Sequence, residues 1–135
     1  MKKITQGIVE EYLRQKEDGS LYHREQKDLE FKESFNLSGL AEYFRDFAAF
    51  SNNVGGFIIF GVTNSPRKLT GLSAKSIEQF NKIDEQTISG FINEHFAPYI
   101  DWEMDLVTYN KMQFGIFYAY PAVLKPVICK KGDDK

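Results

Sequence analysis

The sequence REQKDLEFKES of residues 24–34 is rich in charged side chains, and Glu25, Glu30, Lys32 and Glu33 are the ones that could form a site. Two carboxylates beside a lysine can hold a divalent metal against a phosphodiester and balance its charge, as metal-dependent phosphodiester hydrolysis requires. The same residues are also typical of a solvent-exposed strand that carries a weak salt bridge. Taken alone, the stretch favours the exposed strand.

The alternation within this stretch predicts the strand that would position the charged groups. Leu29 and Phe31 alternate with Glu30 and Lys32, as in a strand with one buried face. We expect the two apolar residues to lie in the core. Glu30 and Lys32 are expected to face whatever lies against the glycine pair Gly55–Gly56.

Hydrophobic spacing predicts a helix before this strand and a helix and a strand after it. The first helix is expected to begin after Thr5 as N-cap and to stop at Gly19. Residues 40–53, LAEYFRDFAAFSNN, predict a second helix with one apolar stripe. Residues 57–62, FIIFGV, form a continuous apolar run that is typical of a central strand buried on both faces.

The later part of the chain predicts one more helical region and a hairpin. Apolar residues from 77 to 96 follow helical spacing, with Gly90 as the expected kink. A tight turn at Asn110–Lys111 predicts an antiparallel hairpin, and residues 127–129 predict a final strand. The fold class is therefore α+β, with a mixed central sheet of about four to six strands flanked by helices.

Composition limits the classes of function. The chain has 135 residues, which favours a single domain over residues 1–135, and Lys and Arg total 17 against 19 acids. Any nucleic-acid binding must therefore come from a local basic patch. Cys129 is the only cysteine, which excludes an internal disulfide and fits a reducing compartment. The sequence has no secretory signal and no apolar run long enough to cross a bilayer, so we expect a cytoplasmic protein without membrane contact.

Two further motifs have residues typical of ligand sites. The turn SNNVGG between the second helix and the central strand permits a positive φ and the close approach of a backbone or a ligand, although taken alone it favours a helix C-cap. Residues 71–76, GLSAKS, end like a phosphate loop. They lack both of its glycines, because Ala74 stands directly before Lys75 and Leu69 stands five residues before Ala74.

Three stretches of the chain together resemble the Schlafen AlbA-like domain family, namely EQKDLEFKES, AFSNNVGGFIIFGVTN and LTGL. The resemblance covers nearly the whole chain, its specific part runs from Glu25 to Leu72, and KPVICK is similar to the family's Lys-Pro-Val strand. It implies a mixed sheet flanked by helices and binding of nucleic acid. Animal Schlafens act as endoribonucleases on structured RNA through clustered acids, so the resemblance also implies a rival activity.

The resemblance carries roles to individual residues. Glu25 and Glu30 match the first two acids of the motif, and Lys32 matches the lysine of its Glu-Phe-Lys core. The resemblance implies that all three are catalytic groups and that the two glutamates are ligands for Mg²⁺ or Mn²⁺. Thr63 and Asn64 stand where nuclease members place a third acid, so cleavage is left open. The motif's Asn and Gly-Gly match Asn52, Gly55 and Gly56.

A basic surface that contacts phosphates completes the sequence-based hypothesis. Its candidate residues are Arg24, Lys27, Lys32, Arg67, Lys68, Lys125, Lys130 and Lys131. If they converge, together with the Asn-Gly-Gly turn, they would bind DNA or RNA with little sequence preference and strong salt dependence.

The leading hypothesis is a nucleic-acid-binding module of a bacterial or archaeal type of transcriptional regulator or defence protein. Family members continue into a further strand, so we expect a domain cut from a longer protein and acting with a C-terminal partner domain. Two alternatives stay open: a metal-dependent endoribonuclease that uses the clustered carboxylates, and a protein-interaction or dimerisation domain. A homodimer is compatible with an edge strand in the late hairpin.

Overall fold

A mixed four-stranded sheet forms the centre of the molecule. The computed structural model describes residues 2–97, 99–123 and 125–130 of the chain. The strands, in their order across the sheet, are β1 (Leu29–Lys32), β2 (Gly56–Phe60), β5 (Met112–Ala119) and β4 (Trp102–Tyr109). β1 and β2 are parallel, and the other neighbours are antiparallel. The predicted α+β class with a mixed sheet is confirmed.

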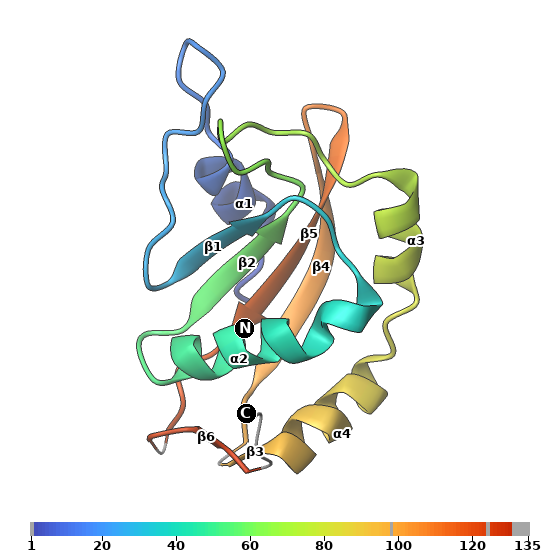
Figure 1. Ribbon diagram of the computed structural model, residues 1–135. Coiled ribbons are helices and arrows are strands. Elements are labelled where there is room, and N and C mark those ends of the chain that lie inside the picture. Colours follow the sequence, from blue (N-terminus) through green and yellow to red (C-terminus); the bar gives the residue numbers. More distant parts are fainter. Residues whose placement is uncertain (1, 98, 124, 131–135) are drawn as a thin grey trace.

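Helices cover both faces of this sheet (Figure 1). One face carries the short 3₁₀ helix η1 (Leu37–Gly39), α2 (Leu40–Ser51), α3 (Ala74–Asn81) and α4 (Glu85–His95), and the opposite face carries α1 (Gln6–Tyr12). A separate pair of short strands, β3 (Phe96–Ala97) and β6 (Ile128–Cys129), lies near the end of α4. The predicted final strand therefore exists, but it belongs to this second sheet.

The core is divided by the sheet into two clusters. Every residue of β2 is buried, and its side chains alternate between the clusters: Ile58 and Phe60 face the α2 side, whereas Phe57 and Ile59 face the α1 side. This confirms the prediction of a strand buried on both faces. On the α2 side, the ring of Phe117 in β5 lies 5.3 Å from that of Phe60, between centroids, at the centre of a dense aromatic cluster.

Element boundaries differ from the sequence-based expectation in two places. Thr5 caps α1 as expected, but the helix ends at Tyr12 and Gly19 lies beyond it in a turn, where its φ is +88°. The third helical region is two helices, and the break falls just before Asp84, which caps α4 by accepting a hydrogen bond from Gln86 N. The expected kink at Gly90 is therefore replaced by an earlier break.

The late hairpin forms as predicted. Asn110 and Lys111 both have positive φ, 52° and 63°, and join β4 to β5 through the two-residue turn that the right-handed twist of paired strands favours. Within the described part of the chain, no helix combines the length and the hydrophobicity that a bilayer crossing needs.

Candidate nucleic-acid interface

Lys32 lies at the centre of a cluster of three carboxylates on the α2 face of the sheet. Its Nζ lies 2.8 Å from Glu30 Oε2, 3.3 Å from Glu42 Oε2 and 3.6 Å from Asp46 Oδ2. Glu30 and Lys32 point to this face because they pair in register with Ile58 and Phe60 of β2, whose side chains also face α2. Lys32 thus contacts Glu42 and Asp46 of α2. The same helix also lies against the Gly55–Gly56 turn, because its Phe50 ring packs on Gly56.

Burial and charge set the protonation of this Lys32 cluster. The Lys32 side chain is 16% exposed. Burial disfavours its charge, but the hydrogen bond to Glu30 and the charges of Glu30 and Asp46 outweigh burial and raise the pKa of the ammonium group. Burial, reinforced by the negative charge of Glu30, raises the pKa of Asp46 to about 6. One cation surrounded by three carboxylates is poorly suited to contact a phosphate.

Glu25 belongs to a different cluster. Its Oε2 accepts a hydrogen bond from Phe31 N at 2.9 Å, and its Oε1 lies 3.6 Å from Arg67 Nη2. The Arg67 guanidinium also lies 5.4 Å from the Phe31 ring centroid and donates to Asn64 Oδ1. The two predicted metal ligands therefore contact different cations. Among the described residues, no three His, Cys, Asp or Glu side chains are grouped as a metal site needs, and Mg²⁺ or Mn²⁺ binding stays a prediction.

The residues of the Asn-Gly-Gly turn, Asn52, Gly55 and Gly56, pack closely against other residues of the protein. Asn52 Oδ1 accepts from Val127 N at 2.6 Å, and Asn52 Nδ2 donates to Val127 O at 3.0 Å. Gly55 has φ +88°, and a Cβ there would lie 2.9 Å from Ala119 O. A Cβ on Gly56 would lie 2.5 Å from the Phe50 ring. Packing accounts for all three residues, and their contact with nucleic acid stays a prediction.

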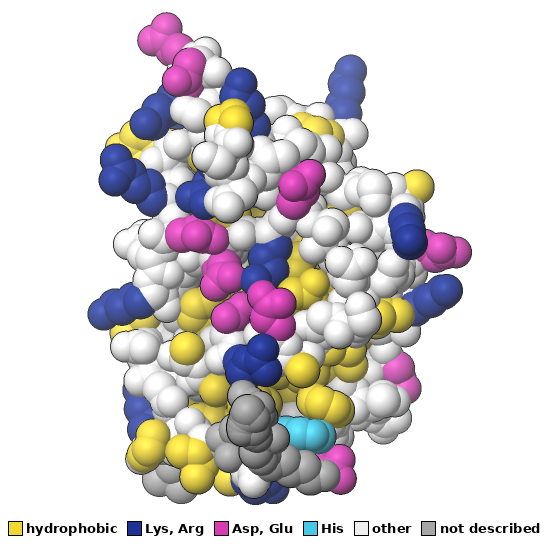
Figure 2. Space-filling view, viewed as in Figure 1, with side chains coloured by type: hydrophobic (Ala, Val, Ile, Leu, Met, Phe, Trp, Pro, Cys, Tyr) yellow, Lys and Arg dark blue, Asp and Glu magenta, His cyan; other side chains and the backbone are white. Residues whose placement is uncertain are grey.

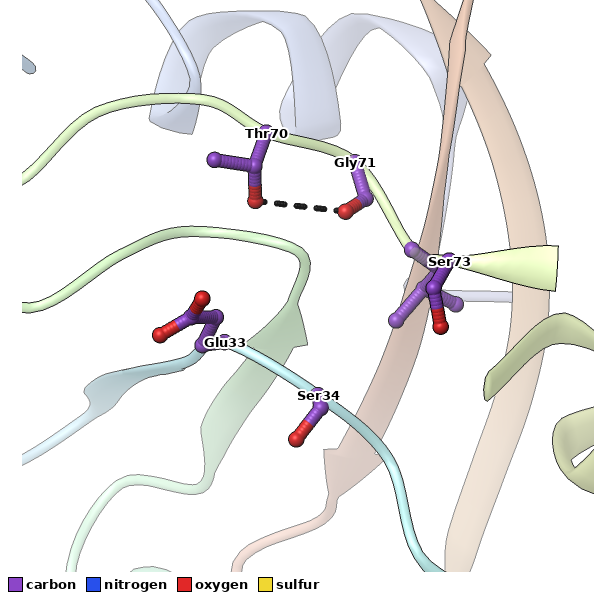
Figure 3. A pocket seen from close by; sticks show the side chains of 6 residues that line it. Glu33, Ser34, Thr70, Gly71 and Ser73 are labelled. Atoms are coloured by element: carbon purple, nitrogen blue, oxygen red, sulfur yellow. Dashed lines mark hydrogen bonds between the residues drawn. The ribbon is translucent and has the colours of Figure 1, made fainter. Parts of the chain in front are cut away.

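A pocket of about 400 Å³ opens where β1 ends, beside the loop that follows β2. Its lining residues are Glu33, Ser34, Thr70, Gly71, Leu72 and Ser73. Figure 3 shows the Glu33 carboxylate in the space between the two loops, and Thr70 Oγ1 donating to Gly71 O at 3.2 Å. Open sheets commonly bind ligands outside the carboxyl ends of parallel strands. A carboxylate among hydroxyl groups suits a polar ligand with hydrogen-bond donors and repels a polyphosphate.

The GLSAKS stretch runs through this region without forming a phosphate cradle. Ser73 caps α3 by accepting from Ser76 N. The buried Ser76 hydroxyl bonds the backbone N and O of Phe35. Ser76 is therefore a packing residue between α3 and the segment after β1.

Several predicted basic residues gather at one end of the molecule. The turn 63–68 follows β2 and docks on the loop 14–28, because Leu21 N donates to Arg67 O at 3.3 Å and Glu25 contacts Arg67. Hydrogen bonds from Ser20 lower the pKa of Asp18, and the charges of Lys16 and Lys68 add to this effect, so both lysines lie within electrostatic range of Asp18. We call this the basic loop surface, and define it as Arg14, Lys16, Arg24, Arg67 and Lys68.

In the space-filling view, several Lys and Arg side chains lie at the upper left, with acidic side chains at the tip of the same region, and a second group of acidic side chains lies with Lys and Arg side chains near the centre (Figure 2). Sequence reasoning missed Arg14 and Lys16, because nothing in their spacing shows that the loop 14–28 folds back on the turn after β2. Both lie in the polar segment just before Arg24, and that proximity was the signal available.

Among the described residues, Lys32, Lys125 and Lys130 of the predicted cations contact other parts of the molecule. Lys27 lies in the turn that precedes β1, and Lys32 lies in its carboxylate cluster. Lys125 Nζ donates to Asn53 O at 2.9 Å, and Lys130 N donates to His95 O, near the second sheet. Lys131 lies outside the described residues.

Comparison with known sequences decides the family. Residues 25–134 match the profile described as Schlafen, AlbA_2, which covers most of the chain. The chain belongs to the Schlafen AlbA_2 family. The match begins at Glu25, the first acid of the motif, and includes the whole sheet.

Relatives of this Schlafen AlbA_2 domain are longer proteins. The chain is 37% identical over 131 residues to the uncharacterized ATP-binding protein UU034 of Ureaplasma parvum, and it spans 36% of that protein. The DIP2311 protein of Corynebacterium diphtheriae has a similar fold, with a TM-score of 0.54 and 16% identity over 88% of this chain and 22% of its own. The N-terminal domain of a DNA helicase RecG-related protein from Nitrosomonas europaea matches with a TM-score of 0.52 and 18% identity, over 82% and 74% of the two chains.

The Schlafen AlbA_2 domain has a built-in pH response at Asp46. The pKa of its carboxyl is about 6 in the folded protein, against an ordinary value of 3.8, so the folded state binds this proton more tightly than the unfolded state. The stabilising contribution is therefore complete below about pH 4 and is lost as pH rises through about 6. We expect Asp46→Asn to raise the free energy of unfolding at pH 7 by about 1–2 kcal/mol.

Urea unfolding at pH 4, 5, 6 and 7 measures this effect. Asp46→Asn is expected to flatten the pH dependence between about 4 and 6. Asp18→Asn is the control, because the Asp18 side chain is fully exposed and its pKa is lowered by Ser20. A wild-type pH dependence retained in Asp46→Asn would contradict the prediction.

Proposed function

We propose that this Schlafen AlbA_2 domain binds nucleic acid, DNA or RNA, through phosphate contacts at the basic loop surface. The observation that carries the proposal is the docking of the turn 63–68 on the loop 14–28, which gathers cations from two distant parts of the sequence. Family membership supports it, and so does structural similarity to a domain of a helicase RecG-related protein.

Charge distribution supports binding at one end of the domain. The whole chain has a formal net charge of −2, so attraction must be local. The acids around Lys32 repel phosphates from the α2 face, and the exposed Lys16, Arg24 and Lys68 attract them at the loop end. Such contacts bind the backbone with little sequence preference.

Triple replacement of exposed cations tests the proposal. The triple variant combines Lys16→Gln, Arg24→Gln and Lys68→Gln. We expect it to bind labelled tRNA and single-stranded DNA about tenfold more weakly than the wild type at 50 mM salt. The slope of log K against log salt should become shallower by about 2, because roughly three phosphate contacts are lost. Fluorescence anisotropy between 50 and 200 mM salt measures both quantities.

The matched control also removes three positive charges, but at exposed positions outside the basic loop surface. It combines Lys3→Gln, Lys75→Gln and Lys82→Gln. It should leave the slope near that of the wild type. A wild-type domain that binds neither nucleic acid would favour the interaction-domain alternative. Cleavage of tRNA with added Mn²⁺ in the same samples would establish the nuclease alternative, which the separation of Glu25 from the Lys32 cluster does not favour.

The domain is also proposed to act with other parts of a larger protein. It spans about a third of the length of the relative UU034, whose name assigns ATP binding to that whole protein. We propose that nucleotide-dependent steps, where they occur in such relatives, belong to other domains, and that this domain supplies contact with nucleic acid.

A further inference from the structure

A second pocket lies beside the basic loop surface, on the α1 face of the sheet. It has a volume of about 290 Å³ and is lined by Ile8, Glu11, Tyr12 and His23. This volume is near the lower end of the range for small-molecule sites, which is about 300–1,000 Å³. The pocket therefore has room for a planar ring, but not for a large ligand.

The walls of the pocket are aromatic and fixed. The ring of Tyr12 packs on Phe57 in the core, at 5.3 Å between centroids, and the edge of His23 meets Tyr12 at 5.4 Å. His23 Nε2 lies 2.8 Å from Glu11 Oε2, which holds the imidazole in place. Ile8, 37% exposed, closes the apolar side. Rigid aromatic walls of this kind suit stacking with a flat, partly polar ring.

Glu11 in the pocket wall contacts Arg14, a cation of the basic loop surface. Arg14 Nη2 donates to Glu11 Oε2 at 3.0 Å, and its guanidinium covers the Tyr22 ring at 3.9 Å from the centroid. Tyr22 is 53% exposed and contacts His23 edge-on. Arg14 and His23 both donate to Oε2 of Glu11, and within the described residues Oε1 of Glu11 accepts no hydrogen bond. A ligand's amino group can donate to that oxygen.

We propose that this pocket binds one unpaired nucleobase of a single strand whose phosphates lie on the basic loop surface. The inference rests on the proposed function and adds to it a preference for single-stranded nucleic acid. Base stacking on aromatic side chains next to a positively charged groove is the usual means of binding single strands without sequence readout. A base within a duplex is stacked and paired, so it cannot enter the pocket.

A substitution that adds positive charge while obstructing the pocket separates base binding from phosphate attraction. Ile8→Lys places an ammonium group at the apolar wall, and Ile8 is exposed, so the helix should still form. Gly7→Lys is the matched control: it adds the same charge one residue away, where a Cβ meets no atom within 4 Å. The probes are a fluorescein-labelled 12-nucleotide DNA strand of mixed sequence and its duplex, measured by anisotropy at 50 mM salt.

Ile8→Lys is expected to weaken binding of the single strand roughly tenfold and to leave duplex binding unchanged or slightly tighter, whereas Gly7→Lys tightens both. Tyr12→Leu, which removes an aromatic wall without a charge change, should also weaken single-strand binding alone. Tighter single-strand binding by Ile8→Lys, with Tyr12→Leu unaffected, would overturn the base pocket and leave the phosphate surface intact. A wild-type protein that binds neither probe would overturn both proposals.

Discussion

Replacing Lys32 with methionine is expected to lower the free energy of unfolding by about 3 kcal/mol at pH 7. The substitution keeps most of the side-chain volume but leaves Glu30, Glu42 and Asp46 facing one another without the cation that now lies within 3.6 Å of each. Glu42 is mostly exposed and adds least to the loss. Urea unfolding followed by circular dichroism measures the change.

A control variant tests whether the loss of stability comes from the position of the Lys32 cation among the three carboxylates and not from the loss of any one positive charge. Lys82→Met removes a cation from an exposed site and should change the free energy of unfolding by less than about 0.5 kcal/mol. Adding Asp46→Asn to Lys32→Met should recover part of the lost stability, because one half-buried carboxylate is then replaced by a neutral amide. A stable Lys32→Met protein that fails to bind or cleave nucleic acid would instead assign Lys32 to the functional site.

Substitution of Gly55 by alanine is expected to cost about 2–4 kcal/mol of folding free energy. The residue has φ +88°, and a Cβ there would lie 2.6 Å from Tyr118 Oη and 2.9 Å from Ala119 O. The carbonyl belongs to the central strand β5 and cannot move away without disturbing the sheet. Both the backbone strain and the collision therefore oppose the substitution.

Gly90→Ala is the control for this prediction. Gly90 lies inside α4, and a Cβ there meets no atom within 4 Å, so alanine should raise stability by up to about 1 kcal/mol through helix propensity. Thermal unfolding of the two variants should give shifts of opposite sign. If Gly55→Ala instead melts like the wild type and loses only nucleic-acid binding, the glycine serves a ligand rather than the fold.

The sequence predicted most of the fold because local pattern decides it. The alternation of Leu29 and Phe31 with charged residues defined β1, and the unbroken apolar run after Gly56 defined β2. Paired positive-φ residues at Asn110 and Lys111 confirmed the hairpin turn. The end of α1 was wrong, because Gly19 can stop a helix or form a turn, and its spacing does not separate the two.

The candidate site was less predictable because its partners come from different elements. Glu42 and Asp46 face Lys32 only if α2 is rotated suitably about its axis where it packs on the sheet. The apolar stripe of a helix is wide, so hydrophobic spacing does not define that rotation closely enough. Glu25 and Glu30 looked like a pair in sequence, yet Glu25 bonds the backbone of Phe31 and contacts Arg67. The docking of two loops created the basic loop surface, and no local pattern reports such contacts.

The amide of Asn52 limits which residue can occupy that position. Its Nδ2 donates to Val127 O and its Oδ1 accepts from Val127 N. The side-chain amide thus forms the same pair of hydrogen bonds with Val127 that a residue of a neighbouring β-strand would form. Aspartate lacks the donor, and glutamine carries its amide one methylene farther out. Because residue 127 takes part through its backbone, its own side chain can vary without altering these bonds. Asn52 therefore joins the end of α2 to the segment around residue 127, and this role needs no ligand.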